Sequence, residues 1–203
     1  MITPSFALTA TERVLPKLAL DFTTASLDPR ITFTRSGATA TRVNASGFIE
    51  TMAANTPRFD FNPVTLVCRG LLIEETRTNL LLYSNDFSQT AVWGNQCTTT
   101  SNSATSPDGT NNAWLVADND AGGTDAVFQN ASVPNNSNPY TFSFYYKKET
   151  SNIISPRMLF TGGGTNASCT CVINTNTNVI TGNTWTSAAV FDAGSGWFRF
   201  VGT

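Results

Sequence analysis

The sequence predicts an all-β protein in which a small N-terminal β-unit precedes a jelly-roll-like β-sandwich. Short runs that alternate apolar and polar residues recur along the chain, and turns rich in Gly, Pro and Asn separate them. No stretch shows the sustained apolar spacing of a long helix. Closely spaced short strands of this kind are typical of sandwiches and barrels. We place the boundary between the units at residue 78, which divides the chain into 1–78 and 79–203.

The N-terminal unit is expected to consist of short strands. The runs KLALDFTT (17–24) and ITFTR (31–35) alternate apolar and polar residues, as half-buried strands do. The run TRVNASGFIET (41–51) predicts a hairpin, because Gly47 suits a left-handed turn position. The run FDF (59–61) places its two phenylalanines on one face of an extended segment.

The clearest strand of the C-terminal unit is expected in the run YTFSFYYKK (140–148). Tyr140, Phe142, Phe144 and Tyr146 lie two residues apart and therefore point to the same side of a strand. We predict that this apolar side faces the core of the sandwich.

The segment RGLLIEETRTNLLLYSNDF (69–87) joins the two units and is more apolar than its surroundings. It predicts short strands at 71–74 and 80–83 with a turn between them. We expect its two apolar clusters to pack the units against each other or against a symmetry mate, and Arg77 to pair with Glu74 or Glu75. Exposed ion pairs of this kind contribute about 0–1 kcal/mol. The predicted interface residues are Leu71, Leu72, Ile73, Arg77, Leu80, Leu81 and Leu82.

The composition argues against catalysis and against nucleic-acid or membrane partners. The chain contains no histidine, which removes the commonest general base and metal ligand. Its 12 Lys and Arg residues are scattered, so no basic stripe is present to contact phosphates. No run of about 18 apolar residues predicts a membrane span. We expect a non-enzymatic protein, and a polysaccharide-degrading enzyme is the disfavoured alternative.

The four cysteines, Cys68, Cys97, Cys169 and Cys171, match no zinc-site spacing. We expect them to be reduced and to pack as small apolar side chains, with Cys169 and Cys171 on one face of a strand. Disulfide pairing is the alternative, because connectivity cannot be deduced from sequence.

Several short motifs occur in a characteristic order within residues 6–87: an LDF strand, an FTR strand, a PRFD element and the GLLIEE-RTNLL element. This order resembles a family of tailed-bacteriophage virion proteins. The resemblance implies a tail-fibre or tail-associated structural protein that docks through its N-terminal unit, and a capsid decoration protein is an alternative. It further implies other virion proteins as partners, a homo-oligomer with a trimer favoured, and assembly into the virion in the host cytoplasm.

From Asn79 onward, NLLLYSNDF and the later GWFRF element resemble jelly-roll carbohydrate-binding modules. In those modules a strand or two follows the GWFR-like element, whereas this sequence ends at Thr203. The last strand is dispensable, or a neighbouring subunit supplies it, or the sequence is part of a longer polypeptide, which is our expectation. The resemblance adds a second alternative function, an adhesin that recognises host-surface glycan through the sandwich.

Sugar recognition combines an exposed aromatic face, on which a pyranose ring stacks, with amide or carboxylate groups that bind hydroxyls. We predict Trp114, Tyr145 and Trp185 as the aromatic partners, with Asn112 and Gln129 as the polar ones. A place in the sandwich core is the alternative for each aromatic residue.

The run ADNDAGGTD (117–125) concentrates Asp118, Asp120 and Asp125 beside two glycines. Carboxylate oxygens of this kind suit Ca²⁺, although the run lacks the register of an EF-hand. We expect either a structural Ca²⁺ site or a solvated polar turn here, and no other cofactor.

Overall fold

The computed structural model describes residues 20–36, 40–119, 121–123, 125–161 and 167–203. These residues form sixteen β-strands and one short 3-10 helix, which confirms the predicted all-β class. All the strands pair antiparallel, in seven sheets of two or three strands. These small sheets do not establish a jelly-roll order, which stays a prediction.

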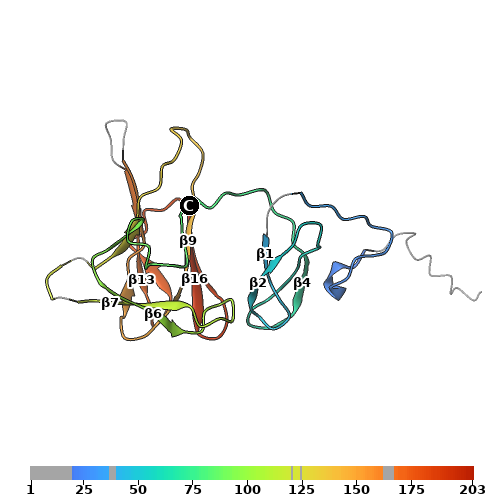
Figure 1. Ribbon diagram of the computed structural model, residues 1–203, viewed down its shortest axis with the longest axis horizontal. Helices are drawn as coiled ribbons and strands as arrows, with labels where there is room; N and C mark the ends of the chain where they lie inside the picture. Colours follow the sequence, from blue (N-terminus) through green and yellow to red (C-terminus); the bar gives the residue numbers. More distant parts are fainter. Residues whose placement is uncertain (1–19, 37–39, 120, 124, 162–166) are drawn as a thin grey trace, which may run out of the picture.

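The strands gather in two lobes that lie side by side in Figure 1. The smaller lobe contains η1 and β1–β4, and the larger lobe contains β5–β16. Residues 72–92 connect the lobes without forming a strand. The domain boundary expected at residue 78 falls within this connection and stays a prediction.

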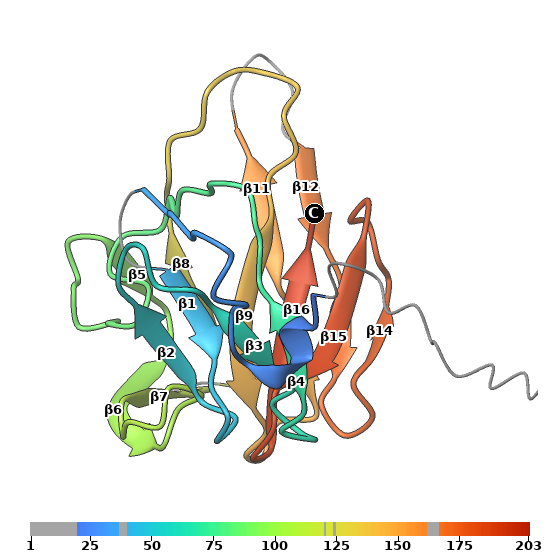
Figure 2. The same cartoon turned by 90° about the vertical axis from the view of Figure 1, so that its right-hand side faces the viewer.

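The smaller lobe is built from two pairs of short strands, and Figure 2 shows it in front of the larger lobe. Its elements are η1 (Phe22–Thr24), β1 (Ala40–Val43), β2 (Ile49–Met52), β3 (Phe59–Phe61) and β4 (Cys68–Leu71). Strands β1 and β2 form the predicted hairpin, and Gly47 has the expected left-handed conformation with φ 85°. The Asn44 side chain shapes the turn by accepting hydrogen bonds from the N–H groups of Ser46 and Phe48 at 2.9 and 3.0 Å.

The strand predicted at 17–24 is wrong where the structure describes it. Residues 22–24 form η1, and the Asp21 carboxylate caps this helix by accepting a hydrogen bond from the Thr23 N–H at 2.9 Å. Such local side-chain bonds compete with a strand ladder. Residues 17–19 lie outside the described part of the chain.

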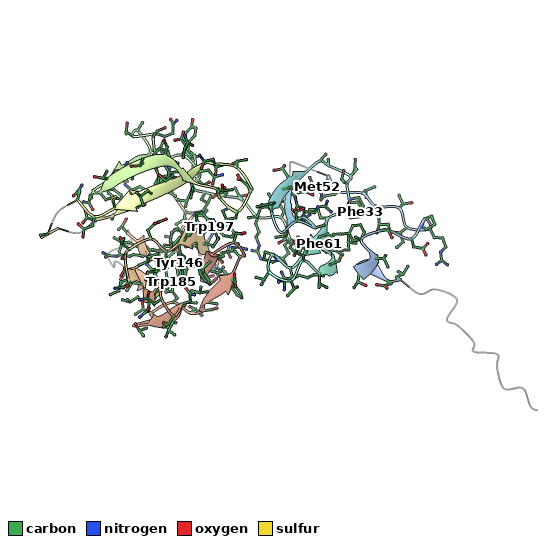
Figure 3. The ribbon with its side chains drawn as sticks, turned by 90° about the horizontal axis from the view of Figure 1, so that it is seen from below. Phe33, Met52, Phe61, Tyr146, Trp185 and Trp197 are labelled. Carbon is green, nitrogen blue, oxygen red and sulfur yellow. The ribbon has the colours of Figure 1, made fainter. Side chains whose placement is uncertain are left out.

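The strand predicted at 31–35 does not form either. The Arg35 N–H donates to the Asn55 side chain at 3.0 Å, and its guanidinium donates to the Met52 carbonyl at 3.0 Å. These bonds tie the segment to the end of β2 without a second ladder. Figure 3 shows Phe33 within the smaller lobe together with Met52 and Phe61.

The larger lobe contains the remaining twelve strands. They are β5 (Trp93–Asn95), β6 (Thr98–Ala104), β7 (Ala113–Ala117), β8 (Val127–Gln129), β9 (Phe142–Lys147), β10 (Ile153–Ile154), β11 (Arg157–Phe160), β12 (Ala167–Thr170), β13 (Val172–Asn174), β14 (Val179–Thr181), β15 (Ala188–Asp192) and β16 (Trp197–Gly202). Two three-stranded sheets, β15-β16-β9 and β10-β13-β14, accompany the pairs β5-β8, β6-β7 and β11-β12.

The core of the larger lobe is apolar and largely aromatic. Its buried members are Tyr146, Cys171, Ile173, Trp185 and Phe200, which come from both three-stranded sheets and from nearby loops. Phe142 and Phe144 pack against this cluster, so the predicted inner face of β9 is confirmed along the strand. Tyr140 precedes β9 and contacts Phe160 instead, with ring centroids 6.0 Å apart. All four cysteines are unpaired, and Cys169 also packs against the core.

The junction differs from its prediction. Strand β4 ends at Leu71, and residues 80–83 form a turn, so both strands expected here are placed wrongly. The turn is stable without a ladder because the Gln129 side chain accepts a hydrogen bond from the Leu82 N–H at 2.7 Å and donates one to the Leu82 carbonyl at 2.8 Å. A side-chain amide thus satisfies the backbone groups that a neighbouring strand would otherwise bind.

The apolar clusters of the junction do not join the lobes. Ile73 is 80% exposed and Leu82 is 59% exposed, and Leu80 is exposed as well, while Leu71, Leu72 and Leu81 are half-buried. Packing against a symmetry mate stays a prediction. Arg77 pairs with Glu75 at 2.8 Å in full exposure, whereas Glu74 pairs with Arg58 at 2.7 Å.

The lobes meet through loops instead. The Ile49 N–H of the smaller lobe donates to the Pro107 carbonyl of the larger lobe at 2.9 Å. A Cβ atom added to Gly194 would lie 2.6 Å from the Pro63 carbonyl oxygen, so these two turns are in close contact. The connection between the lobes therefore depends on backbone approach at turns and not on the leucine clusters.

Candidate functional site

A pocket of about 310 Å³ lies beside Trp114 on the larger lobe. One wall comes from the β6-β7 hairpin, whose register shifts between Thr100 and Ala104. Three residues of β6 therefore bulge opposite Trp114, and Asn102 within the bulge has a left-handed φ of 55°. Bulges re-aim side chains next to functional sites. Here the bulge presents Ser101 and Asn102 to the pocket.

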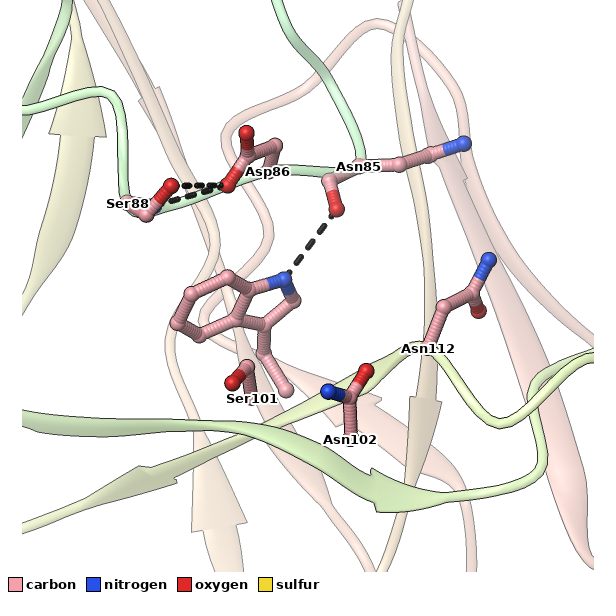
Figure 4. Close-up of a pocket in the computed structure, with 7 residues that line it drawn as sticks. Asn85, Asp86, Ser88, Ser101, Asn102 and Asn112 are labelled. Carbon is pink, nitrogen blue, oxygen red and sulfur yellow. Dashed lines mark hydrogen bonds between the residues drawn. The ribbon is translucent and has the colours of Figure 1, made fainter.

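The other wall is the polar turn at the end of the junction, residues 85–88, to which Asn85, Asp86 and Ser88 contribute. Phe87 anchors this turn because its ring lies 4.9 Å from the Trp93 ring and 5.6 Å from the Trp114 ring, centroid to centroid. The Trp114 indole N–H donates to the Asn85 carbonyl at 3.1 Å, as Figure 4 shows. The indole is thereby held in place by one edge while its ring lines the pocket.

Asp86 gives the pocket a fixed negative charge. Its carboxylate accepts hydrogen bonds from the Ser88 hydroxyl at 2.6 Å and the Ser88 N–H at 3.0 Å (Figure 4), and from the Gln89 side chain at 2.8 Å. The bonds from Ser88 and Gln89 lower the pKa of Asp86, because they stabilise the ionised form. No Lys or Arg is among the seven residues that line the pocket.

Asn112 is oriented by Asp108, which lies outside the pocket. The Asn112 side-chain NH₂ donates to the Asp108 carboxylate at 3.0 Å. Burial raises the pKa of Asp108, but hydrogen bonds from Ser106, Thr110 and Asn112 outweigh burial and lower it to about 2. The ionised Asp108 carboxylate therefore binds the NH₂ group of the Asn112 side chain. The oxygen of the same amide stays available as an acceptor.

The pocket can bind hydroxyl groups. The side-chain amides of Asn85 and Asn102 make no hydrogen bond to any residue that the structure describes, and each can donate and accept. Trp114 is half-buried, and its ring beside amides and one carboxylate is consistent with the pattern expected for sugar recognition. Asp86 is the one carboxylate among the lining residues, whereas canonical glycoside hydrolysis uses a converging pair of carboxyl groups.

Two of the five predicted glycan contacts, Trp114 and Asn112, line this pocket. Trp185 was predicted wrongly, because it is only 4% exposed and packs in the core against Phe200. Gln129 lies outside the pocket and holds the Leu82 backbone, as described above.

Tyr145 is on the outer face of β9, away from the pocket. The Arg199 guanidinium lies 5.7 Å from its ring centroid, and the two residues are cross-strand partners. Burial raises the pKa of Tyr145, Arg199 lowers it, and Asp60 of the smaller lobe raises it. Tyr145 therefore belongs to the surface that faces the smaller lobe.

The predicted Ca²⁺ site is not tested by the structure, because Asp120 lies outside the described residues. Asp118 is exposed and Asp125 is half-buried. Within the described part of the chain, His, Cys, Asp and Glu side chains form no group of three that would hold a metal ion.

Sequence reasoning did not name the other five lining residues, Asn85, Asp86, Ser88, Ser101 and Asn102. The signal available for the first three was a run of polar residues, SNDFS, around a single aromatic residue. No comparable signal marks Ser101 and Asn102, because they lie in a uniformly polar run and reach the pocket through a bulge.

Comparison with known proteins does not assign the site. No protein-family model, curated protein or solved structure matches the chain. None of the helices in the described residues is long and apolar enough to cross a membrane.

Proposed function

We propose that this chain is a non-enzymatic, tail-associated structural protein of a tailed-bacteriophage virion, and that its larger lobe binds neutral host-surface glycan at the Trp114 pocket. The observation that carries the glycan proposal is the Trp114 ring between the amides of Asn85, Asn102 and Asn112. The ordered motifs of residues 6–87 support the virion assignment. The charge of Asp86 favours neutral sugars, because it repels a ligand carboxylate in the same pocket.

Docking to other virion proteins is assigned to the smaller lobe and the connection after it. Val64, Val67 and Ile73 are each more than half exposed there and are available for burial in an assembly. We propose a homotrimer as the assembly. Light scattering of the purified chain tests it, and a monomer at all concentrations would contradict it.

Calorimetric titration of the full chain with neutral oligosaccharides tests the glycan site. We expect Trp114→Ala to weaken binding about tenfold or more, because aromatic anchors dominate binding energy. Asn102→Gly is expected to weaken binding as well. Glycine accepts the positive φ of this position, so the backbone of the bulge is retained while the amide is lost.

Leu115→Ala is the matched control. Leu115 is the next residue on β7, is 37% exposed, and points to the opposite side of the strand from Trp114. Circular dichroism establishes that each variant folds. Equal binding by Trp114→Ala and wild type, or no binding by wild type, would overturn the glycan proposal and leave the virion assignment standing.

Reconstruction of the intact particle by electron cryo-microscopy tests the location. Density for the two lobes at the tail is the expected result. Density spread over the capsid lattice would replace the tail assignment with that of a decoration protein.

A further inference from the structure

A second cavity, of about 240 Å³, lies where the two lobes meet. The smaller lobe contributes Gly47 and Phe48 from the turn between β1 and β2. The larger lobe contributes residues 105–107, Lys147 at the end of β9, residues 193–195 between β15 and β16, and Trp197. A ligand in this cavity would touch both lobes. The volume equals that of about eight waters at ~30 Å³ each, which suits one small molecule.

Lys147 is the one charged side chain among the residues that line this cavity, while the carboxylates of Asp108 and Asp192 bind the lining residues Ser106 and Gly194 from outside it. Its ammonium forms no ion pair or hydrogen bond with any residue that the structure describes, and no carboxylate is among the lining residues. The next residue differs, because Lys148 donates to the side chains of Asn152, at 3.3 Å, and Asn176. The Lys147 Cε lies 3.5 Å from the position of a Cβ at Gly196, so its side chain runs along the β15–β16 turn.

The β15–β16 turn adds backbone donors. Gly194, Ser195 and Gly196 have successive positive φ values of 78°, 53° and 79°. The Gly194 N–H donates to the Asp192 carboxylate at 2.9 Å, whereas the N–H groups of Ser195 and Gly196 find no acceptor in the described part of the chain. Consecutive backbone N–H groups in turns of this kind form anion-binding concavities.

The remaining wall is apolar and flat. Phe48 is 37% exposed and Pro107 is half-buried, whereas Trp197 is buried at 9% exposure, and its indole N–H donates to the Thr105 carbonyl at 2.9 Å. Ring faces of this kind pack against the C–H face of a sugar. The Lys147 ammonium, which has no ion-pair partner among the described residues, matches one ligand carboxylate, and the apolar wall matches the ring that carries it.

We propose that the cavity between the lobes binds a monoanionic sugar acid, a hexuronate, with its carboxylate at Lys147 and the β15–β16 turn and its ring against Phe48 and Pro107. This site is independent of the Trp114 pocket, which is negatively charged and lined by other residues. Because the ligand contacts both lobes, its binding also stabilises their association.

The test titrates the full chain with sodium glucuronate at constant ionic strength, with glucose as the neutral probe. We expect glucuronate to bind and to slow amide exchange at Ile49, whose N–H bonds to Pro107 across the lobe contact. Lys147→Gln is expected to weaken glucuronate binding about tenfold or more. Lys148→Gln removes the same charge one residue away and is expected to leave glucuronate binding unchanged.

Trp114→Ala separates the two sites. In this variant the proposed neutral-sugar site is lost, whereas glucuronate binding is expected to equal that of wild type. Failure of glucuronate to bind wild type would overturn the inference. So would equal weakening by Lys147→Gln and Lys148→Gln, since that result would indicate a general charge effect, or equally tight glucose binding in Trp114→Ala.

Discussion

The larger lobe buries Tyr146, Ile173, Trp185 and Phe200 in one continuous core, whereas the only side chains buried in the described part of the smaller lobe are Arg58 and Phe59. A unit as small as the smaller lobe buries a smaller fraction of its surface on folding, so apolar burial alone stabilises it only marginally. It is held instead by side chains that bond to distant backbone groups. The same fold class is therefore stabilised in two ways within one chain.

The polar bonds of the smaller lobe cross between its strand pairs. The Arg58 guanidinium donates to the Thr41 carbonyl at 2.9 Å, and the Asp60 carboxylate accepts a hydrogen bond from the Val43 N–H at 2.9 Å. Within the β1-β2 pair, Arg42 donates to the Glu50 carboxylate at 2.6 Å. Each such bond contributes about 0.5–3 kcal/mol net to stability.

Phe200→Ala is expected to have the largest effect. The side chain is fully buried between Phe144 and Trp185, with ring centroids 5.5 and 5.7 Å away. The cavity left behind lowers the free energy of unfolding by about 3–5 kcal/mol, as measured by denaturant titration. Phe191→Ala on the outer face of the neighbouring strand is the control, because Phe191 is 55% exposed. An equal loss in both variants would show that the apolar core does not stabilise this lobe.

Arg58→Met is expected to lower the free energy of unfolding of the smaller lobe by about 1–3 kcal/mol. The substitution keeps the apolar stem but leaves the Thr41 carbonyl and Glu74 without their donor. Hydrogen exchange should accelerate in β1 and β3 and stay unchanged in β9 and β16. Arg77→Met is the control, because its ion pair with Glu75 is exposed and contributes less than about 1 kcal/mol. Unchanged exchange in β1 would contradict the polar account of this lobe.

Gly194→Ala tests the contact between the lobes. The added Cβ would meet the Pro63 carbonyl oxygen at 2.6 Å, and φ is 78°. Gly182→Ala shares the positive φ, at 59°, but has nothing within 4 Å of the Cβ position. The strain of a positive φ is expected to lower the free energy of unfolding of both variants by about 1 kcal/mol. Gly194→Ala is expected to lower it by about 1 kcal/mol more, because of the contact with Pro63. Faster exchange of the Ile49 amide in Gly194→Ala alone is the deciding observation.

Asp108→Asn is expected to have the smallest effect on stability, and this effect depends on pH. Its folded pKa of about 2 lies below the unfolded value of 3.8, so its contribution is complete above pH 4 and is lost as pH falls towards 2. After allowance for solvent screening, we expect the Asp108 carboxylate to contribute about 1 kcal/mol to the free energy of unfolding at neutral pH. Denaturant titration of wild type and Asp108→Asn should differ at pH 7 and converge near pH 2. A difference that persists unchanged at pH 2 would exclude the carboxylate charge as the cause.

Local sequence patterns predicted the elements whose stabilising contacts are near in sequence. The β1-β2 hairpin follows from Gly47 and Asn44 within the turn itself, and the inner face of β9 follows from the two-residue period of its aromatic residues. The runs 31–35 and 80–83 have equally good patterns and form no strands. Their backbone is bound by side chains distant in sequence, Asn55 and Gln129, which no local pattern reveals.

The residues of the candidate site also separate into those that the sequence marked and those that only the tertiary structure revealed. Sequence alone determined the all-β class and marked Trp114 and Asn112 as candidates, because strand periodicity and the chemistry of sugar recognition depend on residue type. Only the tertiary structure decided that Trp185 is a core residue, that residues 85–88 lie opposite the β6 bulge, and that Lys147 faces the cavity between the lobes. The physical reason is that burial and the approach of walls distant in sequence arise from packing of the whole chain.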